Sequence, residues 1–546
     1  MRKLTFATLL CLAVAAHAAD QVEEQVRASM KQHLAQRERV LSLEDCIKLA
    51  LEHNLDVQIS RLDPELAQFS LSGSYASYDP ELSLGASRSY DRTPGGLDSQ
   101  GRSYNGTESD TDRFSAGIGG LLPWGLSYNL GGSASDRTGT QPTFTTDFSN
   151  PLTLVTNQYF DLVANAPVTQ LITNYGSLPG RVGFENVSAN VGLLQLRQPL
   201  LKNFWTDATR LQIFLNKRNL KISELGFRSQ VINTITAVEE AYYDLIYAEE
   251  SVKVQEKALE LAERLVAENR RRVEVGALAP LDEKQAESQA SASRADLLAS
   301  RASRDTQQRK LKALLSDDYE DWKGATIHPT ETLQAVPQPL DLQESWRKGM
   351  TLRPDLLQAR LGVEKQEKVV SYQRNQKMPQ LDLVGNLGYT GSSDEYDSAF
   401  RQVQNRNNPY YSYGAQVTIP LGNVGARYSL KSAKATQEQL ELQLRQLEQN
   451  VLILIENSMA NARTSLERTE ATKQASLYAE EALKAEQMKL EKGKSTSFIV
   501  LQLQRDLTSA RSAEIRALAD YNIALARLAF NEGSTLERRG VELKLK

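Results

Sequence analysis

The chain has 546 residues, of which 24% are charged and 7% aromatic, and its formal net charge is -4. This small, mixed charge excludes the basic surface that nucleic-acid binding needs, and the composition favours thin apolar seams over one large core. After the N-terminus no run approaches the roughly 18 apolar residues of a membrane-spanning helix, so any membrane crossing must be made by strands.

The N-terminus has the pattern of a secretory signal peptide. Two basic residues follow Met1, an apolar run follows them, and Ala16-His17-Ala18 forms a small-residue cleavage site. We therefore predict a signal peptide over 1–18 and a polar leader over 19–40. Cleavage would remove Cys11 and leave Cys46 alone, which excludes an intrachain disulfide. The few scattered histidines predict no metal or cofactor site.

The first half begins with helices and continues with strands. Ser42 is a candidate N-cap for a helix to about Glu52, and a second helix is expected from Leu55 to Ser74. Apolar and small polar residues then alternate over 80–91, 113–136 and 186–199, which predicts strands. The middle stretch contains the tight turn at Gly125. The polar segments 91–112 and 137–185 are expected to be connections, and short turns opposite long loops are typical of outer-membrane barrels.

A long coiled-coil helix is predicted over 207–275. Every seventh residue is apolar through Val231, Val238, Leu245, Val252, Leu259, Val266 and Val273. At a rise of about 1.5 Å per residue this helix is roughly 100 Å long, so it is a rod that needs other rods as partners. A turn at Gly276 leads into a returning helix over 277–315. A linker with three prolines and little regular structure is expected over 316–340.

The chain then repeats itself. Leu340 to Glu344 resembles Leu41 to Asp45, and the second repeat, 341–530, has predicted strands over 380–390 and 411–420. Long helices follow over 426–492 and 495–530, with a turn at Gly493, and a tail covers 531–546. The first repeat, 41–315, contains an additional strand pair within 113–136. We favour two further strands of the barrel sheet for this pair. The alternative is a hairpin folded over the extracellular mouth of the barrel.

The predicted strands and helices are too few for one chain to form a pore. Four or six strands cannot close a membrane barrel, whose smallest examples have about eight. Four rods likewise cannot enclose a wide lumen, whereas several copies side by side can. The sequence therefore predicts a homo-oligomeric tube.

The duplicated layout resembles the TolC family of outer-membrane efflux proteins. The resemblance rests on the segment from Val275 to Asp282 and on the strand ends at Pro199-Leu200 and Pro420-Leu421. It implies an α+β membrane protein of the cell outer membrane: a homotrimeric transmembrane β-barrel continued by a long periplasmic α-helical coiled-coil barrel. It also implies a periplasmic adaptor and an inner-membrane efflux pump or ABC exporter as partners. The adaptor would contact the tips, at Val275, Gly276, Ala277, Leu278, Lys492, Gly493 and Lys494.

The resemblance also places a periplasmic gate after the two turns. Asp282 matches a linking aspartate of the family, while Ile499 and Gln502 stand where the family has an acidic ring. An apolar ring at Ile499 would close by packing and dewetting instead of by charge. Asp282 is expected to tether the closed state through Arg272 or Lys494.

Other functions account for less of the sequence. A soluble or periplasmic structural coiled-coil protein without transport activity is the alternative, but it leaves the two-faced strands unexplained. Catalysis is not predicted, because carboxylates such as Asp282 and Asp317 lie at helix ends and turns without a nucleophile or phosphate motif. Efflux and type I secretion use the same kind of tube, so the cargo stays open.

Overall fold

The computed structural model describes residues 38–97, 103–161, 166–276 and 278–542. The expected signal peptide, nearly all of the leader and the tip residue Ala277 lie outside these residues. Within them, no helix combines the length and the apolar character needed to span a bilayer. The described residues form two compact units, one drawn from 38–71, 215–366 and 435–542, the other from 72–214 and 367–434.

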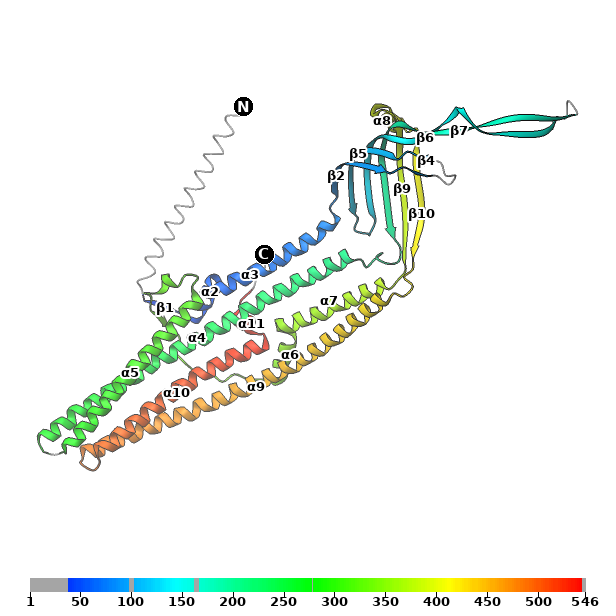
Figure 1. Cartoon of the computed structure of the whole chain (residues 1–546). Coiled ribbons are helices and arrows are strands. Elements are labelled where there is room, and N and C mark those ends of the chain that lie inside the picture. The colour runs from blue at the N-terminus through cyan, green and yellow to red at the C-terminus, as the bar shows by residue number, and fades with distance from the viewer. Residues whose placement is uncertain (1–37, 98–102, 162–165, 277, 543–546) are drawn as a thin grey trace, which may run out of the picture. The chain divides into compact units, whose positions relative to one another are not determined.

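A six-stranded antiparallel sheet forms the second unit (Figure 1). Its strands lie in the order β10-β9-β7-β6-β5-β2, and a two-stranded ribbon, β3 with β4, and the short helix α8 accompany it. The bounds are β2 Glu81–Thr93, β3 Gly96–Leu97, β4 Ser103–Tyr104, β5 Thr107–Leu121, β6 Ser127–Asp161, β7 Ala166–Pro199, β9 Gln380–Ser393, α8 Tyr396–Gln404 and β10 Pro409–Thr418.

The alternation of the sequence becomes two different sheet faces. Leu82 lies opposite Ile118, which lies opposite Leu130, so apolar side chains share one face. The residues that follow them, Ser83, Gly119 and Gly131, are small and belong to the other face. The additional strand pair is confirmed within the sheet as β5 and the start of β6. Its turn closes at Gly125, whose φ is +90°.

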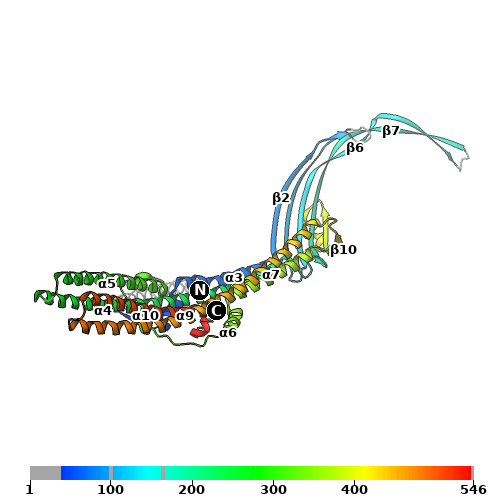
Figure 2. The ribbon, with the colours of Figure 1, turned by 90° about the horizontal axis from the view of Figure 1, so that it is seen from below.

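The expectation of a connection over 137–185 is wrong. Strands β6 and β7 pair along most of this segment and extend beyond the neighbouring strands as a two-stranded hairpin (Figure 2). Its asparagines, glycines and prolines, such as Pro151 and Pro167, are typical of loops. The ladder tolerates them because a two-stranded hairpin has only edge positions, and register shifts near Pro151 absorb the irregularity.

The helices repeat in two sets, which confirms an internally duplicated α+β fold. A pair of helices precedes the strands in each half, and a long helical hairpin follows them. The first set is α2 Leu43–His53, α3 Leu55–Gly73 (continued by the 3₁₀ turn η1 Ser74–Tyr78), α4 Ala208–Glu274 and α5 Pro280–Leu315. The second is α6 Leu342–Leu352, α7 Pro354–Gln376, α9 Val424–Glu491 and α10 Ser497–Glu532, followed by α11 Thr535–Arg539.

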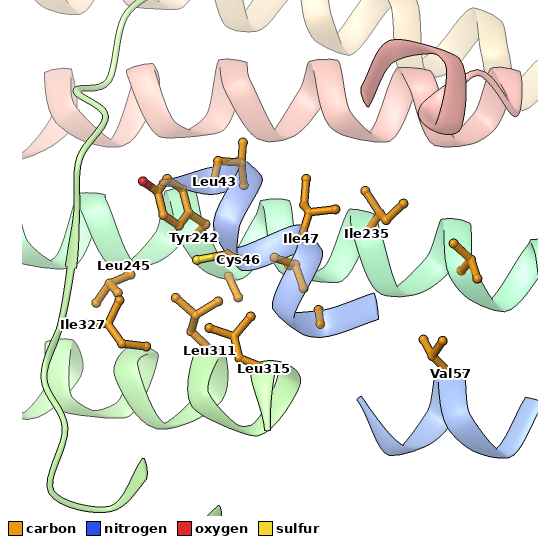
Figure 3. Packing of buried hydrophobic residues seen from close by; sticks show 14 of the residues in the cluster. Leu43, Cys46, Ile47, Val57, Ile235, Tyr242, Leu245, Leu311, Leu315 and Ile327 are labelled. Atoms are coloured by element: carbon orange, nitrogen blue, oxygen red, sulfur yellow. The ribbon is translucent and has the colours of Figure 1, made fainter. Parts of the chain in front are cut away.

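The largest core of the first unit lies where α2 packs on α4 and α5 (Figure 3). The heptad residues Val231, Val238 and Leu245 are buried there. Ser42 caps α2 through a reciprocal capping box with Asp45. Tyr242 donates a hydrogen bond to Glu331, and this contact holds the segment that contains Glu331 against the core.

The segment 316–340 has more regular structure than the sequence analysis predicts. It contains the 3₁₀ turn η2, Tyr319–Trp322, and the strand β8, Ile327–Pro329. Strand β8 pairs in parallel with β1, Arg39–Leu41, from the other end of the sequence. Such short partners, distant in the chain, leave no periodic pattern to detect.

Candidate functional site

The two helical tips end in the same kind of turn. Gly276 and Gly493 have φ of +73° and +72°, the left-handed geometry that glycine adopts without a Cβ penalty. At the second tip Gly493 N–H donates to the carbonyl of Leu490 and Lys494 N–H to that of Lys489, which is a Schellman motif. A Cβ added to either glycine would meet no atom within 4 Å apart from the adjacent residues, so both turns are open on the outside.

The predicted tip residues surround these glycines. Val275 is exposed at the first tip, next to the partly exposed Leu278. Lys492 and Lys494 are exposed at the second tip. The tips therefore differ in chemistry: the first is apolar and the second is cationic.

A buried polar link joins the two hairpins just behind the tips. Asn269 of α4 is 0% exposed and donates from Nδ2 to the carbonyl of Asp282, at 3.2 Å. Its Oδ1 accepts from the Ser497 hydroxyl at the start of α10, at 3.0 Å. Asn269 thus satisfies both hairpins from one amide, and its loss would leave buried groups unpaired.

This link is not predicted above, although the sequence carries a signal for it. Asn269 occupies the second seam position of its heptad, where Ala241, Ala248 and Ala262 precede it. A single asparagine in a coiled-coil seam commonly fixes register at some cost in stability. Its partner, Ser497, lies in another helix and carries no sequence signal of its own.

The predicted gate residues are brought together only in part. Asn269 links the backbone carbonyl of Asp282 to Ser497 at the start of α10. Ser497 lies two residues before Ile499. Ile499 is 43% exposed, and Gln502 donates to Asp506 at 3.1 Å. These positions therefore form one region of the tip end without forming a single contact network.

Arg272, one of the two expected partners of Asp282, is engaged with other groups among the residues that the structure describes. Arg272 pairs with Glu268 one turn earlier and donates to the carbonyl of Leu490 at 3.4 Å. The acid of this turn that does pair with an arginine is Glu283, whose Oε1 lies 3.4 Å from Arg270 Nε. The ion pair at the start of α5 is thus made by Glu283, one residue after the predicted Asp282.

Both units have edges that none of the described residues covers. Strands β2 and β10 each border the six-stranded sheet and pair on one side only, and all residues of β2 are exposed. In the first unit, α3 exposes an apolar stripe with spacings of four and three. Its members are Leu55, Ile59, Leu62, Leu66 and Phe69.

The duplicated fold, the two-faced sheet and the helical tips have a counterpart among known proteins. A family described as "Outer membrane efflux protein" matches residues 173–316 and 350–534, more than half of the chain. This chain belongs to the outer membrane efflux protein family. The match covers both long hairpins and their tips.

Individual relatives of this efflux-family chain are distant in sequence. It is 24% identical over 407 residues to the cobalt-zinc-cadmium resistance protein CzcC of Cupriavidus metallidurans, covering 72% of this chain and 93% of CzcC. It is 23% identical over 345 residues to TolC of Escherichia coli, covering 62% and 68%. The Campylobacter jejuni CmeC outer membrane channel superposes with a TM-score of 0.61 at 15% identity, covering 90% and 86%. This likeness shows a common fold.

In this efflux-family chain no group of three or more histidine, cysteine, aspartate or glutamate side chains could hold a metal ion, within the residues described above. The features that stand out among these residues are surfaces, namely the tips, the free edges and the uncovered sides of the long helices.

Proposed function

We propose that the protein is the exit duct of a tripartite export system, passing substrates from an inner-membrane pump through the periplasm to the exterior. The observation that carries the proposal is the combination of a two-faced, six-stranded sheet with two long helical hairpins in a chain of the outer membrane efflux family. The sheet would cross the membrane, because its apolar face suits lipid and its polar face suits water.

Closure of the duct would come from three copies. The free strands β2 and β10 would pair between neighbours, giving about eighteen strands, enough for an aqueous lumen. The same repetition would cover the apolar stripe of α3. Exposed apolar residues of α9, among them Leu442 and Ile453, form the surface that we expect to cover this stripe. Figure 1 draws α3 and α9 on opposite borders of the helical layer in this unit, as side-by-side packing requires.

The tips would meet a periplasmic adaptor. Replacing Gly276 or Gly493 by leucine puts a side chain on a turn with positive φ and on the outer surface of the tip. Export should fail while the assembled protein stays intact. Gly362 in α7 is the matched control, since it also has open space around its Cβ and no positive φ. Normal export by both tip variants would refute adaptor docking at these turns.

The gate would lie behind the tips, at Asp282, Ile499 and Gln502. Ile499→Ser should weaken apolar closure and raise single-channel conductance. Asp282→Ala should raise it by removing a carboxylate that stabilises the first turn of α5. If neither variant changes conductance while neutralising Asp506 does, the gate lies deeper along α10.

The conducting activity is tested with purified protein in planar lipid bilayers. A discrete channel conductance, together with export in cells that depends on a pump and an adaptor, is the expected result. A folded protein that gives no conductance and supports no export would favour the structural coiled-coil alternative.

A further inference from the structure

A groove opens between α4, α9 and α10, which run side by side in the first unit (Figures 1 and 2). Its volume is about 650 Å³, and each of the three helices supplies part of the lining. The lining residues that matter here are Glu240 of α4, Arg468 of α9, and Asp520, Arg527 and Phe530 of α10.

The groove lies on the side of these helices that the short elements leave uncovered. Helix α10 turns Tyr521 toward the segment 330–340, where its hydroxyl donates to the carbonyl of Val336 at 2.7 Å. Asp520 and Arg527 leave α10 together, roughly 100° to 120° around the helix from Tyr521, because successive residues are about 100° apart. Helix α4 behaves alike, with Tyr242 in the core under α2 and Glu240 in the groove. In a closed tube this uncovered side would face the lumen.

The ion pairs of the groove are arranged with the cation outward. Arg527 Nε donates to Glu240 at 2.6 Å, and the arginine side chain is 60% exposed whereas the glutamate is 26% exposed. Arg468 Nη1 donates to Asp520 at 3.4 Å, with exposures of 55% and 26%. The carboxylates are therefore covered by the arginines, and the surface that a solute meets is cationic although the pairs are neutral in sum.

The guanidinium groups keep donors for a ligand. Arg527 uses Nε for Glu240, and Arg468 uses one terminal nitrogen for Asp520, among the contacts within the described ranges. A guanidinium has five N–H donors in a planar fork that matches carboxylates, sulfonates and phosphates. Two such groups from different helices can grip one oxyanion.

The remainder of the lining is amphipathic. Phe530, Ile523 and Ala237 offer apolar contact, and Asn233 and Asn461 offer amides. An aromatic or aliphatic body beside an anionic group would satisfy both kinds of lining.

We infer that this groove is a binding site for small organic anions in transit, with Arg468 and Arg527 holding the anionic group. The inference rests on the proposed duct function only for placing the groove in the lumen. Cargo carrying a carboxylate, sulfonate or phosphate on an apolar body would rest there, once per subunit, on its way along the helices.

The test measures equilibrium binding of naphthalene-1-sulfonate to the full protein in lipid nanodiscs, with empty nanodiscs as the blank. Loss of one charge-assisted contact should raise Kd about tenfold in Arg527→Gln and in Arg468→Gln. Arg511→Gln is the matched control. Arg511 also lies on α10 and pairs with a glutamate of α9, Glu480, at 2.8 Å, but it lies outside the groove. The Kd of the Arg511→Gln variant for naphthalene-1-sulfonate should stay within about twofold of the wild-type value.

Glu240→Gln keeps every arginine and frees Arg527, so it should tighten binding several-fold. This direction separates a binding role from a structural one, because a loosened groove would weaken binding. The inference is overturned if Glu240→Gln and both arginine variants leave Kd unchanged, or if the cation 1-naphthylmethylammonium binds as tightly as the sulfonate.

Planar-bilayer recording on the same preparation separates this inference from the proposed function. Arginine-dependent binding by a protein without conductance would refute the duct and keep the anion site. Conductance with arginine-independent binding would refute the anion site and keep the duct.

Discussion

The hairpins α4–α5 and α9–α10 are held differently along their length. Where α2 covers α4 and α5, the contacts are a broad apolar core that contains Val238, Tyr242 and Leu245, all fully buried. Near the tips a smaller leucine-rich cluster, which contains Leu265 and Leu501, replaces it. There the hairpins are joined by polar links such as that of Asn269 with Ser497.

This difference implies a division of labour. Separating the covered region exposes large apolar side chains to water, which is costly. Separating the tips exposes fewer such side chains and breaks hydrogen bonds that water can replace. The tip end is therefore the part of the hairpins that can change conformation while the remainder stays folded.

The largest expected effect concerns a charge buried in the covered region. Glu239 of α4 is 0% exposed and pairs with Arg539 of α11. Arg539→Met would leave the carboxylate buried without its partner, at a cost of about 3 to 5 kcal/mol in the free energy of unfolding. Guanidinium unfolding followed by circular dichroism measures it. Arg538→Met removes an exposed neighbour and its hydrogen bond to the Leu525 carbonyl, at 2.8 Å, and should cost about 1 kcal/mol. Equal losses would mean that the pair does not anchor α11.

A matched pair of leucines compares the two regions directly. Leu245→Ala in the covered core should lower the free energy of unfolding by about 3 kcal/mol, because a buried cavity remains. Leu265→Ala near the tips should cost less and should raise hydrogen exchange only in the last turns of the hairpins. If the order of the two losses is reversed, the tip is the better anchored end.

The sequence predicts what its periodicity encodes. The heptads from Val231 predict α4, the alternation from Leu82 predicts β2, and the glycines at 276 and 493 predict the turns, because each pattern reports a local backbone geometry. Contacts between distant segments leave no such pattern. The pairing of β1 with β8 and the extension of β6 and β7 over 137–185 needed the structure.

The candidate site divides in the same way. The tip residues follow from the turns, whereas the link from Asn269 to Ser497 depends on how two hairpins pack. The seam asparagine was visible in the sequence, but its partner was not. The groove around Arg527 was invisible too, since its ion pairs join residues up to 287 positions apart.

The polar link should have a smaller effect on stability than the cores. Asn269→Leu and Ser497→Ala each should lower the free energy of unfolding by about 1 to 2 kcal/mol, since each leaves a buried group unpaired. Hydrogen exchange of Val500 and Leu501 amides should rise in both variants. A double variant whose loss equals the sum of the single losses would show that the two residues do not act together.

The smallest effect is a difference between two cysteine positions in their rate of reaction with a maleimide. Burial, with smaller contributions from the charges of Glu331 and Asp45, raises the pKa of Cys46 to about 12, so almost no thiolate exists at pH 8. A maleimide should label Cys46 only after unfolding, whereas a cysteine placed at the exposed Val275 should react at once. Rapid labelling of Cys46 in the native protein would mean that the covered region opens as readily as the tips.

The central claim is that three copies of the chain assemble, so that β2 of one copy pairs with β10 of the next and the apolar stripe of α3 packs on a neighbouring α9. Native mass spectrometry of the protein released from detergent micelles tests it most directly. We expect one dominant species of three times the mass of the mature chain, and variants at the tips should leave this mass unchanged. A stable, homogeneous monomer under the same conditions would contradict it.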